Sequence, residues 1–166
     1  RSRYKQIVFR QEPFTTKTAI KAHQISFLLL GGIPKELVYD QDKLLLKDEN
    51  GGDLIQTQEF KRYVESESFT VYYCRKSDPQ SKGKIENVIK YIKQNFLRGR
   101  KFTSIELLNE QAQGWLERTG NGKKHQTTFK IPLEEWEIEK QYLIPIKNQH
   151  VMQEENQIYH TVRKDH

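Results

Sequence analysis

Short apolar runs typical of β-strands alternate with longer stretches of helical periodicity along this chain, and this alternation constrains the fold more than any other feature. The runs Glu36 to Tyr39 and Phe69 to Cys74 are short and rich in β-branched and aromatic residues, whereas Lys84 to Leu97 has helical spacing. Strands and helices in alternation favour a sheet that is covered by helices. The sequence therefore predicts an α/β domain.

Two further helices are indicated by periodicity and by their ends. Thr16 to Leu30 has an apolar stripe, and Gly31 and Gly32 are suited to end it because glycine adopts left-handed conformations easily. A third helix should open at Thr103, which has the capping-box spacing to Glu106. In the stretch from 84 to 97, four apolar residues recur at intervals of four, three and four, and we expect them to be buried: Ile85, Ile89, Ile92 and Phe96.

Alternating polar and apolar residues predict a strand over Tyr4 to Phe9. Residues 44–46 and 54–55 flank an Asn-Gly pair, which favours a hairpin. After Gly122 the periodicity fades, so we expect one compact domain over residues 1–122 and an extended arm over residues 123–166.

Charge and composition narrow the range of partners. Lys and Arg outnumber Asp and Glu by 28 to 22, which favours polyanionic partners such as DNA. The apolar runs are much shorter than the roughly 18 residues of a bilayer span, so we expect no membrane segment. A single cysteine, Cys74, fits a reducing cytosol and a structural role. The five histidines lack a paired metal-ligand spacing, and His23 on its apolar stripe is expected to be packed.

Two carboxylates are candidates for a metal site. Asp40 directly follows a predicted strand, and Glu86 stands in the first turn of the predicted helix 84–97, so both can approach one edge of a sheet. Oxygen ligands of this kind suit Mg²⁺. The alternative is that Asp40 caps a turn and Glu86 only complements a helix N-terminus.

The residues around both carboxylates resemble a known family. Residues 31–41 (GGIPKELVYDQ) and 78–87 (DPQSKGKIEN) resemble, in this order, the second and third acidic motifs of IstA-type transposases, the insertion sequence family twenty-one group of DDE enzymes. Further similar positions are Ala22, His23, Phe27, His125, Thr127, Thr128 and the stretch 136–140 (WEIEK). Together these positions cover most of the chain.

The resemblance implies a ribonuclease-H-like mixed sheet flanked by helices and a catalytic site built on acidic residues. Asp40 would be the second metal-binding acid and Glu86 the third, with Asp42 as the fallback for Asp40 and Gly83 allowing a tight turn before the helix. It also implies two Mg²⁺ or Mn²⁺ ions that support cleavage at DNA 3′ ends and strand transfer.

The family's first acid lies on a strand before the segment that resembles Tyr4 to Phe9. The acidic residues before Asp40 are Glu12 and Glu36, and neither has a matching context. We therefore expect an N-terminally truncated core that is inactive alone, with an arm that leads toward a C-terminal β-barrel outside this chain.

The resemblance implies as partners transposon-end DNA, target DNA, further copies of the chain and an AAA+ helper ATPase. The ATPase is expected to be a separate protein, because this chain has no phosphate-binding Gly-Lys-Ser or Gly-Lys-Thr loop. The basic residues expected to contact DNA are Lys43, Arg75, Lys76, Lys82, Lys84, Lys90 and Lys93, with a solvated helix face as the alternative for each. Two other functions stay open: a non-catalytic DNA-binding or assembly module, and a ribonuclease-H-like nuclease that does not join strands.

Overall fold

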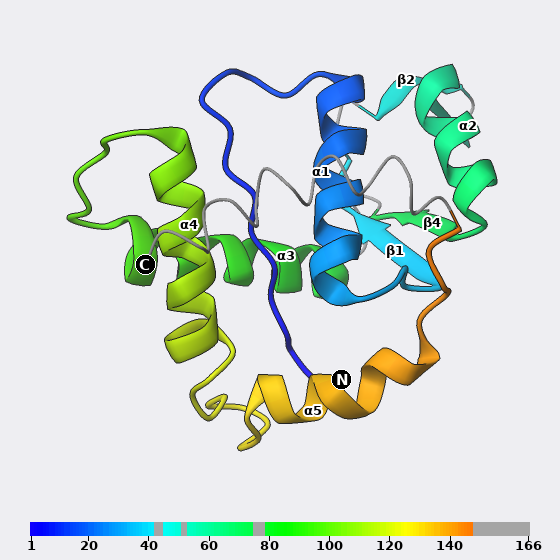
Figure 1. Ribbon diagram of the computed structural model, residues 1–166. Coiled ribbons are helices and arrows are strands. Elements are labelled where there is room, and N and C mark those ends of the chain that lie inside the picture. The colour runs from blue at the N-terminus through cyan, green and yellow to red at the C-terminus, as the bar shows by residue number, and fades with distance from the viewer. Residues whose placement is uncertain (42–44, 51–52, 75–78, 148–166) are drawn as a thin grey trace. The chain divides into compact units, whose positions relative to one another are not determined.

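A computed structural model describes residues 1–41, 45–50, 53–74 and 79–147 (Figure 1). Its elements form two compact units. The central unit comprises Glu12–Ile20 and Pro34–Phe102, and the terminal unit comprises Arg1–Gln11, Lys21–Ile33 and Thr103–His166. In chain order the elements are α1 (Thr16–Leu30), β1 (Glu36–Tyr39), β2 (Leu46–Asn50), β3 (Asp53–Gln56), α2 (Gln58–Glu67), β4 (Thr70–Tyr73), α3 (Pro79–Ile92), the π-helix η1 (Lys93–Leu97), α4 (Ile105–Trp115), the π-helix η2 (Leu116–Gly120), α5 (Pro132–Glu139) and the 3₁₀-helix η3 (Lys140–Tyr142).

The mixed α/β class expected from the sequence is confirmed in the central unit. Strands β1 and β4 pair in parallel, with Glu36 opposite Thr70 and Tyr39 opposite Tyr73. A parallel pair needs a crossover connection, which here includes the hairpin and α2. The ladder continues one residue past β4, because the Cys74 N–H donates to the Tyr39 carbonyl at 2.8 Å.

An aromatic cluster packs one face of this strand pair against α2. The ring of Tyr39 lies 5.7 Å from that of Phe60 and 5.6 Å from that of Tyr73, and Tyr63 lies 5.9 Å from Phe69. Phe60 is completely buried. Helix α2 begins after Thr57, whose hydroxyl accepts the Phe60 N–H, as expected for an N-cap. The aromatic faces therefore fix the position of β1, and with it that of the residue that follows.

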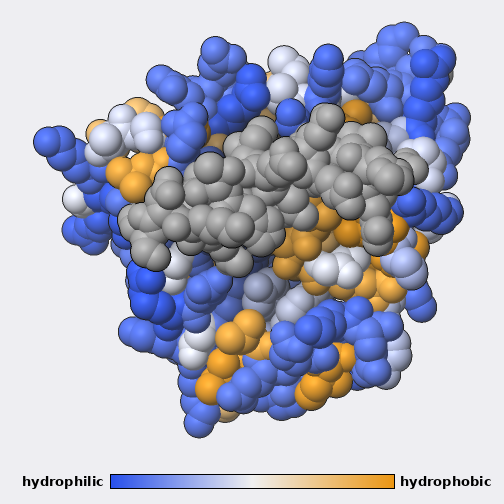
Figure 2. Space-filling view, in the orientation of Figure 1, coloured by the Kyte–Doolittle hydropathy of each residue, from blue (hydrophilic) through white to orange (hydrophobic). Residues whose placement is uncertain are grey.

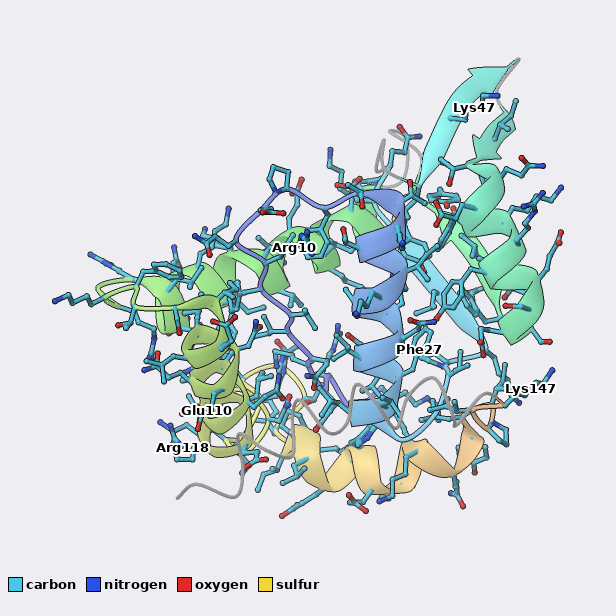
Figure 3. All side chains as sticks on the ribbon, turned by 45° about the horizontal axis from the view of Figure 1, so that its top comes forward. Arg10, Phe27, Lys47, Glu110, Arg118 and Lys147 are labelled. Atoms are coloured by element: carbon cyan, nitrogen blue, oxygen red, sulfur yellow. The ribbon has the colours of Figure 1, made fainter. Side chains whose placement is uncertain are left out.

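The predicted hairpin is also present. Strands β2 and β3 pair antiparallel from Leu46 opposite Gln56 to Asn50 opposite Asp53, with a register shift between Leu46 and Asp48. The residue at that shift is Lys47, and Figure 3 shows the hairpin extending beyond α2. The turn residues Gly51 and Gly52 lie outside the described residues.

Helix α3 differs from its expected form in two ways. It begins at Pro79 instead of Lys84, because proline suits a first helical position, where its fixed φ is favourable and its missing N–H is not needed. Of the four residues expected to be buried, Phe96 in η1 is buried, Ile85 and Ile92 are half-buried, and Ile89 is 48% exposed. Periodicity shows which residues share a helix face, but does not show whether another element covers that face.

In the terminal unit, residues 4–9 do not form the predicted strand. The segment is extended, but the side-chain amides of α4 and its continuation satisfy alternate residues of its backbone. Asn121 accepts the Lys5 N–H at 2.7 Å and donates to the Lys5 carbonyl at 2.9 Å, and Asn109 makes the same pair of bonds with Phe9 at 2.7 and 2.9 Å. Between them, Gln113 donates to the Ile7 carbonyl at 3.2 Å. We call these bonds the amide ladder.

Glycines end the helices where the sequence predicts. Gly31 has a φ of 84°, and its N–H donates to the Phe27 carbonyl at 2.9 Å, which closes α1. A Cβ on Gly32 would lie 2.7 Å from that of Leu143, so this position excludes a side chain next to the Ile33–Ile144 bridge. The helical run from α4 through η2 ends at Gly120, whereas its N-cap is Ser104 rather than Thr103.

The segment expected to be an extended arm has a helix over Pro132–Glu139. The ring of Trp136 in α5 stacks on that of Tyr4 at 5.1 Å, and the Ser2 N–H donates to Glu139 at 2.8 Å. Figure 1 shows the start of the chain lying against α5. Residues 148–166 lie outside the described part, and the boundary at residue 122 stays a prediction.

The residues that resemble the family motif near His125 form a closed turn, which we call the Phe129 turn (residues 125–130). The His125 N–H donates to the Lys130 carbonyl and the Phe129 N–H to the His125 carbonyl, both at 2.8 Å. The His125 Nδ1 accepts the N–H groups of Thr127 at 3.2 Å and Thr128 at 3.4 Å. An imidazole that accepts at Nδ1 must be unprotonated there.

The face in view in Figure 2 is mostly hydrophilic, and its apolar side chains form separate patches. In the described ranges, no helix has both the length and the apolar character that crossing a bilayer requires.

We expect Asn121→Ala to lower the free energy of unfolding by about 2 kcal/mol, because Asn121 is 1% exposed and its loss removes both partners of the Lys5 backbone. Urea denaturation measures this. Asn95→Ala is the control: Asn95 is exposed and donates to the Tyr91 carbonyl, so we expect a change below about 0.5 kcal/mol. Equal losses in the two variants would contradict the role of the amide ladder.

The stability of the terminal unit should fall in mild acid through His125. Burial lowers the pKa of His125 below its ordinary value of 6.5, and the charges of Lys5 and Arg3 add to this effect. A depressed folded-state pKa means that the unfolded chain binds more protons, so this contribution is present above pH 6.5 and is lost as pH falls through the folded pKa. When the pH falls from about 7.5 to about 5.5, the free energy of unfolding measured by urea denaturation should fall less for His125→Asn than for the parent. Parallel pH profiles would contradict this account.

Candidate functional site

Asp40 stands where the sequence predicts, immediately after β1 at the carboxyl end of the parallel strand pair. Its side chain is exposed, and its Oδ1 accepts the N–H of Gln41 at 2.9 Å. The preceding Tyr39 is packed in the aromatic cluster, where burial, followed by the nearby Tyr73 and Tyr63, raises its pKa well above the ordinary value. The strand thus presents a carboxylate at the edge of the sheet while its neighbour anchors the backbone.

Glu86 lies on α3, but the prediction that it stands in the first turn is wrong. Because the helix already begins at Pro79, Glu86 lies in its interior, where the N-terminal end of the helix dipole has little effect. Its side chain is 63% exposed, and Oε1 lies 3.8 Å from the Nζ of Lys82. The helix-terminus alternative therefore does not explain Glu86, and its position is open to solvent and to a ligand.

Gly83 does not form the tight turn that the resemblance implies. It lies within α3, and a Cβ built on it would meet no atom within 4 Å. Neither a left-handed backbone nor a close approach requires glycine at this position.

The two carboxylates lie in the same compact unit and on two different elements, the end of β1 and the middle of α3. Their exposed oxygens are of the hard type that Mg²⁺ prefers, so the donor chemistry fits a divalent ion. The fallback residue Asp42 lies outside the described residues. Within the described ranges, the structure contains no group of three or more His, Cys, Asp or Glu side chains placed to hold a metal ion.

Lysines predicted to contact DNA are exposed along α3 and η1. Lys82, Lys84 and Lys90 lie on α3, and Lys93 begins η1. Figure 3 shows the many side chains that project from these helices. Lys43, Arg75 and Lys76 lie outside the described residues.

One basic residue after η1 has a structural contact instead. The guanidinium of Arg100 lies 4.2 Å from the centre of the buried Phe96 ring, and its Nε donates to the Phe96 carbonyl at 3.0 Å. This cation–π contact holds the end of the helix, which the sequence pattern did not indicate.

The remaining sequence predictions concern packed residues. Cys74 is 2% exposed, which agrees with a structural role. The His23 ring meets that of Phe27 edge to face at 6.0 Å, which agrees with a packed histidine.

A second group of cations, which the sequence analysis missed, lies in the terminal unit. The Nζ of Lys5 donates to the carbonyls of Gly120 at 3.0 Å and Arg3 at 3.1 Å, and burial, followed by the charge of Arg3, lowers its pKa. Both residues act electrostatically on His125. Lys5 falls within the strand predicted over Tyr4 to Phe9, and the sequence pattern does not show that this segment lies near His125.

The chain matches known transposases along most of its length, although no family model matches it. It is 51% identical over 166 residues, 99% of the chain, to the transposase for insertion sequence element IS21-like of Bacteroides fragilis, and covers 32% of that protein. It is also 34% identical over 123 residues to a putative transposase for insertion sequence element IS5376 of Geobacillus stearothermophilus, and 26% identical over 122 residues to the transposase for insertion sequence element IS21 of Pseudomonas aeruginosa. These matches cover 74% and 73% of the chain and 31% of each relative. The chain thus spans about a third of the length of the curated relatives that it matches, and within that span it belongs to the family of IS21-type transposases.

Proposed function

We propose that this chain forms part of the ribonuclease-H-like catalytic core of a DDE transposase, which cuts DNA at 3′ ends and joins them to target DNA. The observation that supports it best is the position of Asp40, exposed at the carboxyl end of a parallel strand, in a sequence that matches a transposase over 99% of its length. Ligands of open α/β sheets commonly bind at this edge.

In this proposal Asp40 and Glu86 are catalytic residues that hold divalent metal ions. Both side chains are exposed, so neither needs a change in packing to reach an ion. Lys82 would have to release Glu86 or stay as a neighbour, which is inexpensive because a solvent-exposed pair at 3.8 Å contributes little to stability. A further carboxylate would come from transposase sequence beyond this chain, so this chain alone should cleave little or no DNA.

Two Mg²⁺ or Mn²⁺ ions bound there would activate a water or a DNA 3′-hydroxyl and stabilise the leaving oxygen. The protein's own residues fix the geometry: the paired strands hold the backbone at Asp40, and α3 presents Glu86. Carboxylates on regular elements are placed more accurately than those on loops.

DNA would lie along the exposed lysines of α3 and η1. Four lysines over Lys82 to Lys93 project into solvent, and each phosphate that they neutralise releases condensed counterions. Because Glu86 is on the same helix, this arrangement would bring the DNA backbone to the candidate metal site.

The complete protein would act on transposon-end and target DNA in the bacterial cytoplasm, as a multimer and with a separate AAA+ ATPase. In this view residues 1–122 belong to the core and residues 123–166 lead toward a C-terminal β-barrel.

In the complete transposase, we expect Asp40→Ala and Glu86→Ala each to lower strand cleavage and strand transfer at least about 100-fold, since removing groups that stabilise charge in the transition state has effects of this size. A strand-transfer assay with a free DNA 3′-hydroxyl and Mg²⁺ measures both steps. Glu65→Ala on α2, also exposed and in the same unit, is the matched control and should retain activity.

The outcomes separate the competing functions. Full activity in both variants would leave a non-catalytic module as the better reading, whereas cleavage without any joining by the parent would favour a nuclease. The free energy of unfolding of the variants, measured by urea denaturation, should change by less than about 0.5 kcal/mol, because both side chains are exposed. A loss of activity would then not reflect a loss of folding.

The double variant Lys84→Glu/Lys90→Glu should bind DNA at least about tenfold more weakly. The plot of log affinity against log salt should become shallower, with the magnitude of its slope reduced by about 1.8 for duplex DNA. Fluorescence anisotropy over a salt series measures both. The control is Lys61→Glu/Arg62→Glu, which reverses two exposed charges on α2. If both double variants weaken binding equally, general surface charge explains the effect and α3 is not the DNA-binding face.

A further inference from the structure

The Phe129 turn displays an aromatic ring to solvent in an unusual way. Phe129 is 71% exposed, the largest exposed fraction among the large hydrophobic residues of the described part of the chain. Its φ of 56° is in the left-handed region, which bulky side chains rarely adopt. Glycine would suit this backbone better, so the ring is kept at a conformational cost and without the benefit of burial.

Hydrogen bonds hold the backbone of the turn on which this ring stands. Two backbone bonds of 2.8 Å close it, and the His125 Nδ1 ties the N–H groups of Thr127 and Thr128 from inside. The residues that flank the turn are also fixed, because the Leu133 N–H donates to the Asn121 carbonyl at 2.9 Å and Asn121 is part of the amide ladder. A backbone that is already ordered loses little conformational entropy when the side chain on it meets a ligand.

Basic residues flank Phe129 in the sequence. The stretch 121–131 has three lysines and no acidic residue, and all three are exposed: Lys123, Lys124 and Lys130. Arg3 and Lys5 act on His125 from the N-terminal segment. Lys130 pairs with Glu135 of α5, with 3.1 Å between Nζ and Oε2.

We propose that the Phe129 turn is a second DNA contact, in which the ring stacks on an unpaired base while Lys123 and Lys124 neutralise adjacent phosphates. This inference rests on the proposed action on DNA and adds a contact in the terminal unit, whereas the candidate metal site belongs to the central unit. An exposed aromatic ring among lysines is the combination that binds single-stranded nucleic acid, because every base has a face on which a ring can stack. A purely anionic ligand would need the lysines and not the ring.

Phe129→Gly tests the ring, because glycine removes it and also relieves the left-handed backbone, so thermal stability should be equal or higher. Fluorescence anisotropy with this chain should show about tenfold weaker binding to a single-stranded oligonucleotide and to a duplex with an unpaired bubble, and a change below about twofold for a fully paired duplex. Phe129→Trp should bind as the parent does. Lys123→Ala/Lys124→Ala should lower the salt slope on single strands by about 1.4, whereas Phe129→Gly should leave it unchanged.

Tyr142→Ala is the matched control, because Tyr142 is 66% exposed in the same unit but lies outside the turn, and its loss should not change binding. Unchanged affinity of Phe129→Gly for all three DNAs would overturn the proposal, as would an equal loss on paired and unpaired DNA or an absence of DNA binding by the parent. The catalytic assignment is tested separately by strand transfer in the complete transposase, so a failure of this binding test is distinguishable from a failure of the catalytic assignment.

Discussion

The parallel pairing of β1 with β4 determines where the candidate site lies. Parallel strands need long connections, and here the crossover includes α2, whose Phe60 and Tyr63 join the aromatic cluster on one face of the strands. The cluster stabilises β1 up to Tyr39, and the chain becomes exposed one residue later at Asp40. An acidic side chain at this point is at the surface although its backbone is anchored in the packed part of the unit.

The terminal unit satisfies an extended backbone by different means. The backbone groups of Lys5, Ile7 and Phe9 form hydrogen bonds with the side chains of Asn121, Gln113 and Asn109 in place of a neighbouring strand. An amide side chain has the donor and acceptor of a peptide group, so a helical run with amides at suitable positions can substitute for a strand edge. The pairing covers alternate residues because successive peptide groups of an extended chain point to opposite sides.

Local signals in the sequence predicted the elements whose causes are local. The hairpin and the glycine at the end of α1 follow from turn residues and left-handed backbone, which neighbouring residues determine. The strand predicted over residues 4–9 was wrong because a strand requires a partner strand, and alternation within one segment cannot show that side chains from residues 109–121 will serve instead. Asp40 was placed correctly, since its position depends on the end of β1, whereas Glu86 was misplaced relative to the helix start because Pro79 was read as part of a loop.

The sites proposed for the two units differ in how strongly the fold constrains them. Asp40 and Glu86 are exposed and contribute little to packing, so the stability of the fold does not require an acid at either position. Phe129 differs from both acids, because its left-handed backbone destabilises the folded state and its exposed ring gains little stability from burial. A closed turn, an inward-facing His125 and the amide ladder at its base together offset this strain. Several hydrogen bonds stabilise a turn that exposes one aromatic ring to solvent. A ligand that contacts the ring is the simplest explanation for this arrangement.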